Sequence, residues 1–218
     1  GTEDAATLGL KNLLLLHQDI MADSAGFGSF DYIIAHGIYS WTPPAVRDRV
    51  LALCRAHLAP HGVAFVSYMT YPGGYLPQMV REMMRFHVQH FEGPQHQVRQ
   101  ARAMLKLLMD AQTHDTPYRG VLEQAYERIR RKTNEYFYHD DLSGSYAPCY
   151  FHQFMDHAQQ HQLQFLAEAV FFETFGRGYP PNVEAALDSL GSNVTLQQQQ
   201  AAQAARQPYS DYKVIRRN

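Results

Sequence analysis

Short apolar runs alternate with an amphipathic stretch in the first third of the chain, and this alternation predicts an α/β fold. Three runs fit buried strands, namely Leu13–Leu16, Tyr32–Ala35 and Val63–Tyr68. The second run is rich in β-branched residues and ends at a turn, as expected for a strand buried on both faces of a parallel sheet. Between the second and third runs, Thr42 opens an amphipathic helix that stops at Pro60–Gly62. We therefore expect three neighbouring parallel strands in one doubly wound sheet.

The pattern changes to helical spacing after Gly74. Apolar residues recur at this spacing in three stretches, Leu76–His87, Val98–Leu108 and Tyr118–Ile129. Each stretch carries one apolar face, so together they predict a helical insert with a small core of its own. Residues 134–148 are rich in aromatic and turn residues and predict an irregular crossing.

The last third of the chain predicts a return to the sheet. Phe151–Ala158 fits a short helix, and Leu163–Ala169 alternates as a strand does. A strand that follows a helix in this way can rejoin the first sheet. The Pro-Pro pair at 180–181 opens another helix, and the Gln/Ala-rich run Leu196–Gln207 is helical by propensity.

Composition narrows the functional classes. The formal net charge is −2 at pH 7, so no basic field favours nucleic acid as a partner. No apolar run approaches the ~20 residues that a membrane-spanning helix needs. The two cysteines, Cys54 and Cys149, are far apart and have no metal-binding spacing. So few cysteines favour a reduced, cytoplasmic compartment over a disulfide scaffold.

Side chains suited to ligand binding gather at the predicted strand ends, where ligands bind in open α/β sheets. They are Asp19 and Ile20 after the first strand, His36, Gly37 and Tyr39 after the second, and Tyr68, Thr70 and Tyr71 at the third. A carboxylate can accept a hydrogen bond from an exocyclic amine, and a branched side chain can pack on a purine. Together they suit a nucleotide-like ligand beside a reacting centre, although Asp19 taken alone is better explained as a helix N-cap or loop residue.

Histidine is abundant, so a metal site must be weighed. His157 and His161 are four residues apart on a predicted helix with His152 nearby, and His87 and His90 are three apart. No acidic or cysteine partner stands at motif spacing, so we expect no metal. A serine hydrolase is less favoured still, because the chain has no Gly-x-Ser-x-Gly elbow.

Three motifs in order resemble a known family. LHQDI, FDYIIAHGIYSW and LAPHGVAFVSYMTYPGG resemble the later half of a class I S-adenosylmethionine-dependent methyltransferase, of the bacterial kind that carries a methyltransferase regulatory domain. The helical stretch after Gly74 and the segment Cys149–Ala169 resemble that regulatory region. The resemblance implies a partial, Rossmann-like doubly wound sheet at residues 1–73. Residues 74–218 would be the mainly helical regulatory domain, with residues 150–170 returning to the sheet.

The resemblance also implies roles for the strand-end residues. Asp19 would meet the adenine amino group of S-adenosylmethionine and Ile20 would pack on the adenine. The methionine part of the cofactor would lie near Ala35, His36 and Gly37. His36 and Tyr39 are the candidate catalytic residues, and the acceptor side would be lined by Tyr39, Trp41, Tyr68 and Tyr71. Similar helical regions occur in rickettsial protein-lysine methyltransferases, so a protein lysine is one candidate acceptor.

The chain departs from the family at both ends. Nothing before Leu13 offers the strand, glycine-rich loop and acidic residue that hold the cofactor, and the last strand of the family sheet is expected to begin about where Asn218 ends the chain. We therefore expect a fragment that binds S-adenosylmethionine weakly by itself. The partner would be a methyl acceptor, either protein or small molecule, and homo-oligomerisation stays open. The alternative is a non-catalytic regulatory or oligomerisation module that lacks cofactor binding.

Overall fold

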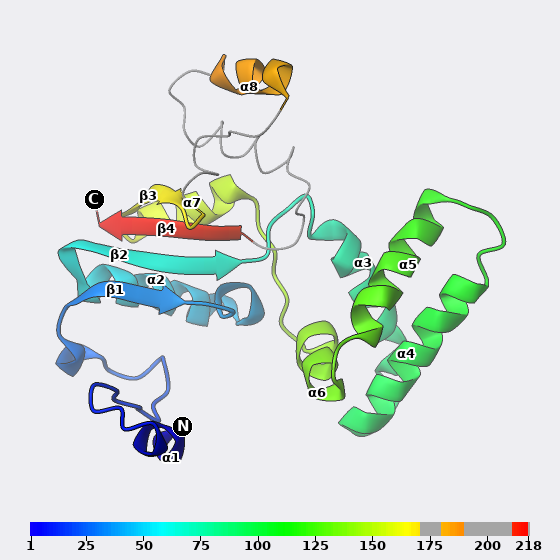
Figure 1. Cartoon of the computed structure of the whole chain (residues 1–218), viewed down its shortest axis with the longest axis horizontal. Helices are drawn as coiled ribbons and strands as arrows, with labels where there is room; N and C mark the ends of the chain where they lie inside the picture. Colours follow the sequence, from blue (N-terminus) through cyan, green and yellow to red (C-terminus); the bar gives the residue numbers. More distant parts are fainter. Residues whose placement is uncertain (171–179, 190–210, 218) are drawn as a thin grey trace.

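The described residues form a sheet of four strands, which lies at one end of the molecule (Figure 1). A computed structural model describes residues 1–170, 180–189 and 211–217. In these residues the strand order is β1-β2-β4-β3. Their bounds are Phe30–Ala35 for β1, Leu58–Tyr68 for β2, Leu163–Glu168 for β3 and Asp211–Arg217 for β4. β1 and β2 are parallel, whereas β4 is antiparallel to both of its neighbours.

Helix α2, Pro44–His57, makes the crossover between β1 and β2. Its N-cap is Pro43 and Pro44 occupies the first turn, where a missing N–H costs little, so the helix begins just after the predicted start. β2 follows directly, and the predicted stop at Pro60–Gly62 lies inside this strand. A Cβ on Gly62 would come within 2.8 Å of the Phe30 carbonyl oxygen, so the close approach of β1 requires glycine here. The parallel β1–β2 pair itself is confirmed.

One face of the sheet is covered by α2 and α7, the latter spanning Phe151–Gln160. The two helices and the strands bury a common apolar cluster. Its members include Val50, Leu51 and Cys54 from α2, Phe151, Phe154 and Met155 from α7, and Ala64, Val66, Leu163 and Ile215 from the strands. This core fixes where the carboxyl ends of β1 and β2 lie.

The other face of β1 is exposed, contrary to the predicted burial on both faces. The side chains of Tyr32 and Ile34 are 76% and 72% exposed, whereas Ala35 is buried. Successive side chains of a strand point to opposite faces, and α2 and α7 cover only one of them in the described part of the chain. An apolar run therefore did not distinguish a strand covered on one face from one covered on both.

The predicted strand Leu13–Leu16 is wrong. These residues follow the short helix α1, Thr2–Thr7, and form no strand; all four leucines are exposed, with Leu14 at 78%. Leucine lacks the β-branch that fits a pleated surface, so an apolar run made only of leucine is a weak strand signal. The chain then enters β1 through a 3-10 turn at Ala25–Phe27.

The predicted return to the sheet is confirmed, and the last strand is present. β3 lies in the same sheet as β1 and β2, as the alternation in Leu163–Ala169 predicts. β4 lies between β2 and β3, so the expectation that the final strand falls beyond Asn218 is wrong. The predicted helix after Pro180 is α8, Pro181–Asp188. The predicted helix at Leu196–Gln207 lies outside the described residues.

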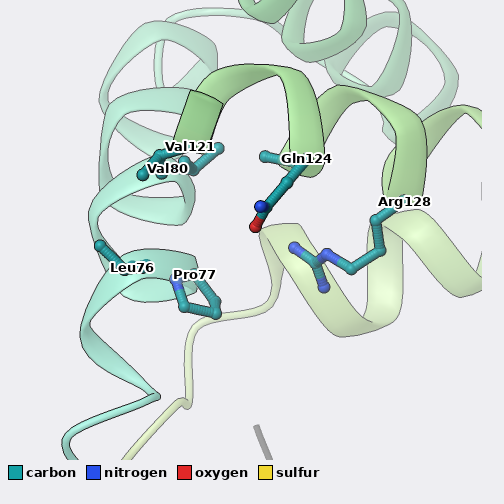
Figure 2. A pocket seen from close by; sticks show the side chains of 7 residues that line it. Leu76, Pro77, Val80, Val121, Gln124 and Arg128 are labelled. Atoms are coloured by element: carbon teal, nitrogen blue, oxygen red, sulfur yellow. The ribbon is translucent and has the colours of Figure 1, made fainter. Parts of the chain in front are cut away.

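A separate helical unit follows β2, on the side to which β1 and β2 point (Figure 1). It contains α3, Tyr75–Val88, α4, Pro94–Asp110, and α5, Pro117–Arg130. These helices bury their own cluster around Met84, Leu105 and Leu122, which confirms the predicted insert with its own core. A small hollow lies between α3 and α5, bordered by residues such as Leu76 and Arg128 (Figure 2). No helix among the described residues is long and apolar enough to cross a membrane.

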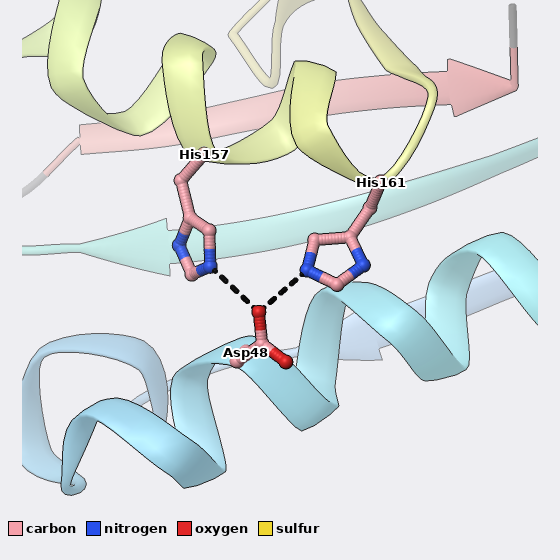
Figure 3. A group of neighbouring side chains, drawn as sticks. All are labelled: Asp48, His157 and His161. Atoms are coloured by element: carbon pink, nitrogen blue, oxygen red, sulfur yellow. Dashed lines mark hydrogen bonds and ion pairs between the residues drawn. The ribbon is translucent and has the colours of Figure 1, made fainter.

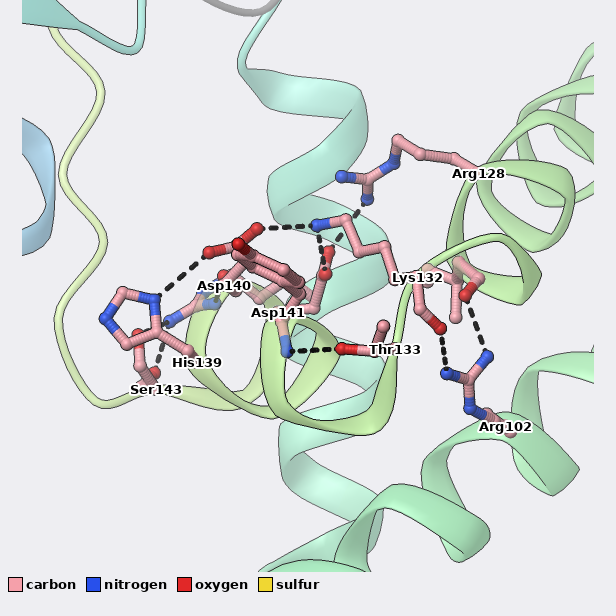
Figure 4. A network of polar contacts seen from close by, with 11 residues as sticks. Arg102, Arg128, Lys132, Thr133, His139, Asp140, Asp141 and Ser143 are labelled. Atoms are coloured by element: carbon pink, nitrogen blue, oxygen red, sulfur yellow. Dashed lines mark hydrogen bonds and ion pairs between the residues drawn. The ribbon is translucent and has the colours of Figure 1, made fainter. Parts of the chain in front are cut away.

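A network of charged groups joins the last part of the helical unit to the end of α5 (Figure 4). The chain predicted as an irregular crossing begins with helix α6, Asn134–Phe137, and a π-helical turn, Tyr138–Leu142. The buried carboxylate of Asp141 accepts hydrogen bonds from Arg128 at 3.0 Å and from Lys132 at 2.7 Å. These bonds tie the turn to the end of α5, because a buried carboxylate needs such partners.

Candidate active site

The carboxyl ends of β1 and β2 meet at the hydroxyl of Ser67. The backbone N–H of Gly37 donates to Ser67 Oγ at 2.8 Å, and Nδ1 of His36 lies 3.0 Å from the same oxygen. Gly37 has φ +68°, a backbone conformation that glycine adopts without strain. The turn after β1 is therefore held against β2, with His36 exposed at its surface.

A second serine, in the 3-10 helix that follows β1, also links the chain after β1 to the chain after β2. Ser40 is buried in the 3-10 helix Tyr39–Trp41, and its Oγ accepts a hydrogen bond from the Met69 N–H at 2.8 Å. The Ala147 N–H donates to the Ser40 carbonyl, also at 2.8 Å. The chain that leaves the helical unit is thus bound to the 3-10 helix that follows β1.

Tyr39 and Tyr68 point into the core beneath this junction. The Tyr68 ring stacks on Phe154 at 4.6 Å between centroids, and the Tyr39 ring meets Phe154 edge-on at 5.3 Å. The Tyr39 hydroxyl lies 2.7 Å from Nδ1 of His157. Burial raises the pKa of Tyr39 well above its usual value. Tyr39 is therefore a neutral phenol at ordinary pH and acts through hydrogen bonding.

Trp41 faces the helical unit. The guanidinium of Arg81, on α3, lies 5.7 Å from the Trp41 ring centroid and 5.0 Å from that of Tyr146. Arg81 is buried and donates to the backbone carbonyls of Asp140, at 2.5 Å, and Ser143. Burial lowers the pKa of Arg81 to about 10, so it remains a cation at neutral pH. Arg81 thereby connects the helical unit to a candidate site residue.

Three tyrosine rings gather beyond the end of β2. The Tyr71 ring stacks on Tyr75 at 4.1 Å and lies 5.4 Å from Tyr150. The Tyr71 hydroxyl donates to Gln78 Oε1 at 2.5 Å, and partial burial raises the pKa of this hydroxyl. Tyr75 remains half exposed. The three rings form a partly exposed aromatic cluster just beyond β2.

The first predicted strand end is placed differently from the other two. Asp19 is exposed, and its Oδ1 accepts from the Met21 N–H at 2.9 Å in a tight turn. Ile20 packs on the sheet core, and its carbonyl accepts from Arg49 on α2 at 3.1 Å. The structure therefore brings six of the predicted site residues to the β1 and β2 ends and the loop between β1 and α2, and Tyr71 just beyond β2. It holds Asp19 in a loop along α2, and the role of each residue stays a prediction.

Sequence reasoning missed the groups that join these elements. Ser67 and Ser40 looked like ordinary polar residues, although a serine in an otherwise apolar strand is a detectable signal. Asp48 was also missed: its Oδ1 lies 2.8 Å from Nε2 of His161 and 3.3 Å from Nε2 of His157 (Figure 3). Hydrogen bonds from His161 and His157 hold the pKa of the Asp48 carboxyl below its usual value.

Comparison with known proteins places the chain in a family. A family model described as a predicted methyltransferase regulatory domain matches residues 133–217. Protein RP789 of Rickettsia prowazekii (strain Madrid E) is 35% identical over 197 residues, which is 90% of this chain and 36% of that protein. Protein RP028 of the same organism is 33% identical over 167 residues, which is 76% of this chain and 67% of that protein.

Solved structures agree with these relatives. PKMT2 from Rickettsia typhi matches with a TM-score of 0.81 and 27% identity, covering 100% of this chain and 41% of PKMT2. Its complex with AdoHcy matches with a TM-score of 0.83 at 27% identity, covering 100% of this chain and 42% of PKMT2. The chain thus spans about two fifths of PKMT2 and about a third of RP789. It belongs to the family of methyltransferases that carry a methyltransferase regulatory domain.

Proposed function

We propose that this chain supplies part of the cofactor and acceptor site, together with the regulatory domain, of an S-adenosylmethionine-dependent methyltransferase. The observation that carries the proposal is the junction at Ser67, which holds His36 and Gly37 at the end of β1 beside the end of β2. The family match and the likeness to a protein solved with AdoHcy support it. AdoHcy is S-adenosylhomocysteine, the product left after methyl transfer.

The junction suits the reacting end of the cofactor. Gly37 has no side chain and its positive φ turns the backbone away from β1, which leaves room for a ligand above the strand end. His36 lies beside it with its ring exposed. In open α/β sheets, ligands bind outside the carboxyl ends of the strands. We therefore assign the methionine part of the cofactor to Ala35, His36 and Gly37.

Methyl transfer needs mainly alignment and the removal of a proton. The lone pair of the acceptor attacks the methyl carbon, the carbon–sulfur bond breaks, and its electron pair stays on the sulfur of S-adenosylhomocysteine. An amine acceptor that is protonated must lose a proton before this attack, because only the neutral amine has the lone pair. His36 is the better candidate to take this proton, because its imidazole is exposed and Ser67 fixes its Nδ1, whereas Tyr39 is buried and neutral.

An amine acceptor fits the aromatic lining, which would bind the protonated amine before it loses its proton and attacks. Tyr71, Tyr75 and Tyr150 present ring faces near the end of β2, and aromatic faces attract ammonium groups. A lysine side chain could enter with its methylenes along these rings and its nitrogen toward the β1–β2 junction. We infer a protein lysine as the acceptor, in line with the helical regions of rickettsial protein-lysine methyltransferases that this chain resembles.

The cofactor part of the proposal is tested by two aspartates with the same local structure. Asp19 and Asp23 are both exposed, and each accepts a hydrogen bond from the N–H two residues on, at 2.9 and 3.0 Å. Only Asp19 is assigned to the adenine amine. Asp19→Ala should therefore weaken S-adenosylmethionine binding by roughly ten- to a hundredfold, since a hydrogen bond to a charged group contributes about 1.5–3 kcal/mol. Asp23→Ala is the matched control.

Calorimetry should measure S-adenosylmethionine binding by two proteins. One is a longer protein of this family that joins a glycine-rich cofactor loop to the start of this chain, and the other is the present chain. We expect tight binding by the longer protein and far weaker binding by the present chain. Equal losses in the Asp19 and Asp23 variants would mean that only the loop structure matters, and would remove Asp19 from the cofactor site. Tight binding by the present chain alone would show that the site is misplaced.

A further inference from the structure

Three potential metal ligands converge between the two helices that cover the sheet. Asp48 lies on the outer side of α2, while His157 lies in the last turn of α7 and His161 is its C-cap residue (Figure 3). One ligand atom from each lies within 4.8 Å of the other two. His157 and His161 are four residues apart, but Asp48 precedes His157 by 109 residues, so the packing of α7 beside α2 assembles the cluster.

The spacing of the ligand atoms is close to that of a metal site. Zinc holds nitrogen and oxygen ligands at about 2.0–2.1 Å, which separates tetrahedral ligands by about 3.3 Å. Asp48 Oδ1 lies 3.3 Å from Nε2 of His157 and 2.8 Å from Nε2 of His161. A small rotation of the exposed Asp48 side chain, which is 59% accessible, would place an ion between all three.

A further residue orients one of the two histidines, His157. Nδ1 of His157 is 2.7 Å from the Tyr39 hydroxyl, which is held in the aromatic core. A metal-bound histidine commonly gives its second ring N–H to such a partner, which fixes the tautomer and the ring orientation. If Tyr39 accepts this N–H, the lone pair of Nε2 points toward Asp48. The cluster thus has both the ligands and a support behind one of them.

The cluster is open to entry from solvent. Asp48 and His157 line a hollow together with Pro44, Ala45 and Arg47. Three protein ligands leave a fourth tetrahedral position, and this position would face the hollow. Arg47 adds a positive charge there, which favours an anion such as chloride or hydroxide as the fourth ligand.

We propose that Asp48, His157 and His161 bind one divalent transition metal ion, with Zn²⁺ as the preferred occupant, and that the ion clamps α7 to α2. Two imidazoles and one carboxylate suit zinc better than Mg²⁺ or Ca²⁺, which prefer oxygen ligands. Because α2 links β1 to β2, the clamp would fix the helix that leads out of the candidate active site. The proposal does not depend on methyl transfer.

Titration calorimetry of the metal-free 218-residue chain with Zn²⁺ is the direct test. We expect one site that Asp48→Asn and His161→Gln each weaken by about 100-fold or more, since loss of a supporting residue alone costs about 10–100-fold. His152→Gln is the matched control, because His152 lies on α7 outside the cluster. Co²⁺ should give the absorption bands of a tetrahedral site in the parent chain and in the control.

Two further readouts separate a metal site from a simple hydrogen-bonded contact. Tyr39→Phe should weaken Zn²⁺ binding about 10-fold, because the hydroxyl orients His157. Zn²⁺ at a hundredfold excess over its Kd should raise the Tm of the parent chain by about 5 °C, but not that of the Asp48→Asn variant. Absence of a stoichiometric site would overturn the proposal. So would binding that survives both Asp48→Asn and His161→Gln, or that His152→Gln lowers equally.

Discussion

The sheet half and the helical unit each have a buried apolar core, but they use their polar groups differently. In the helical unit, buried charged side chains stabilise the fold: Asp141 binds Arg128 and Lys132, and Arg81 binds backbone carbonyls. The sheet half also has one buried ion pair, Lys213 with Glu168. In addition it has His36 exposed beside the strand ends and the partly exposed Asp48 cluster between α2 and α7. The proposed chemistry is therefore placed in the sheet half. The regulatory-domain match, residues 133–217, begins after α5 and includes α7, β3 and β4, so it extends into the sheet half.

The contacts between the two parts include a cation–π pair and a backbone hydrogen bond. Arg81 reaches from α3 to the ring of Trp41, and the Ala147 N–H binds the carbonyl of Ser40. Both contacts end on the short 3-10 helix that follows β1. A structural change in the helical unit would therefore first move the residues on the acceptor side of the proposed site.

The largest expected loss of stability comes from substitutions that disrupt each of the two cores separately. Leu122→Ala removes a fully buried side chain of the helical core and Phe154→Ala one of the sheet core. We expect losses of about 2–5 and 3–5 kcal/mol respectively. Hydrogen exchange should show lost protection in α3–α5 for the first variant and in β2, β3 and α7 for the second. Loss of protection everywhere in both variants would contradict the independence of the two cores.

A smaller effect should follow from cutting the contact between the parts. Arg81→Met keeps an unbranched side chain but removes the cation and leaves the Asp140 and Ser143 carbonyls without this donor. We expect a loss of about 1–3 kcal/mol. Trp41 is the only tryptophan, so its fluorescence should shift as its surroundings change.

Arg85→Met is the control for this substitution. Arg85 lies on the same helix but is exposed, so neither stability nor Trp41 emission should change. If the Arg81 and Arg85 variants have the same emission, Arg81 does not connect the helical unit to Trp41, and the account of coupling between the parts is wrong.

Much of the fold could be predicted because local patterns specify it. The β1–α2–β2 unit, the helical insert and the return of β3 all follow from periodicity and turn residues. The four leucines at 13–16 misled the prediction, since an apolar run does not reveal whether a partner strand is available. β4, Asp211–Arg217, was missed because four of its seven residues are charged, which hides the apolar pattern of a buried strand. Lys213, buried beside Glu168, carries no apolar signal.

The site was predictable only where it follows the strand ends. His36, Gly37, Tyr39 and Tyr68 stand next to apolar runs, so their approximate location follows from the topology rule for α/β sheets. Asp48 and His157 are 109 residues apart, and Arg81 reaches Trp41 across two units. Such contacts depend on helix packing, which a single sequence does not encode in any local pattern.

The most direct test of the central claim compares two glycines. Gly37 and Gly93 both have positive φ, +68° and +80°, and a Cβ would meet nothing within 4 Å at either position. Gly37 ends β1 in the proposed cofactor site, while Gly93 is the N-cap of α4 in the helical unit. Alanine at either position should cost about 1–3 kcal/mol of stability, because a positive φ is strained for an L-residue.

The measurement is the affinity for S-adenosylhomocysteine of a cofactor-binding protein that contains this chain, with each substitution in turn. The account predicts that Gly37→Ala weakens binding about tenfold or more, while Gly93→Ala leaves the affinity unchanged despite a similar loss of stability. Equal affinities in the two variants would contradict the assignment of the cofactor to the ends of β1 and β2.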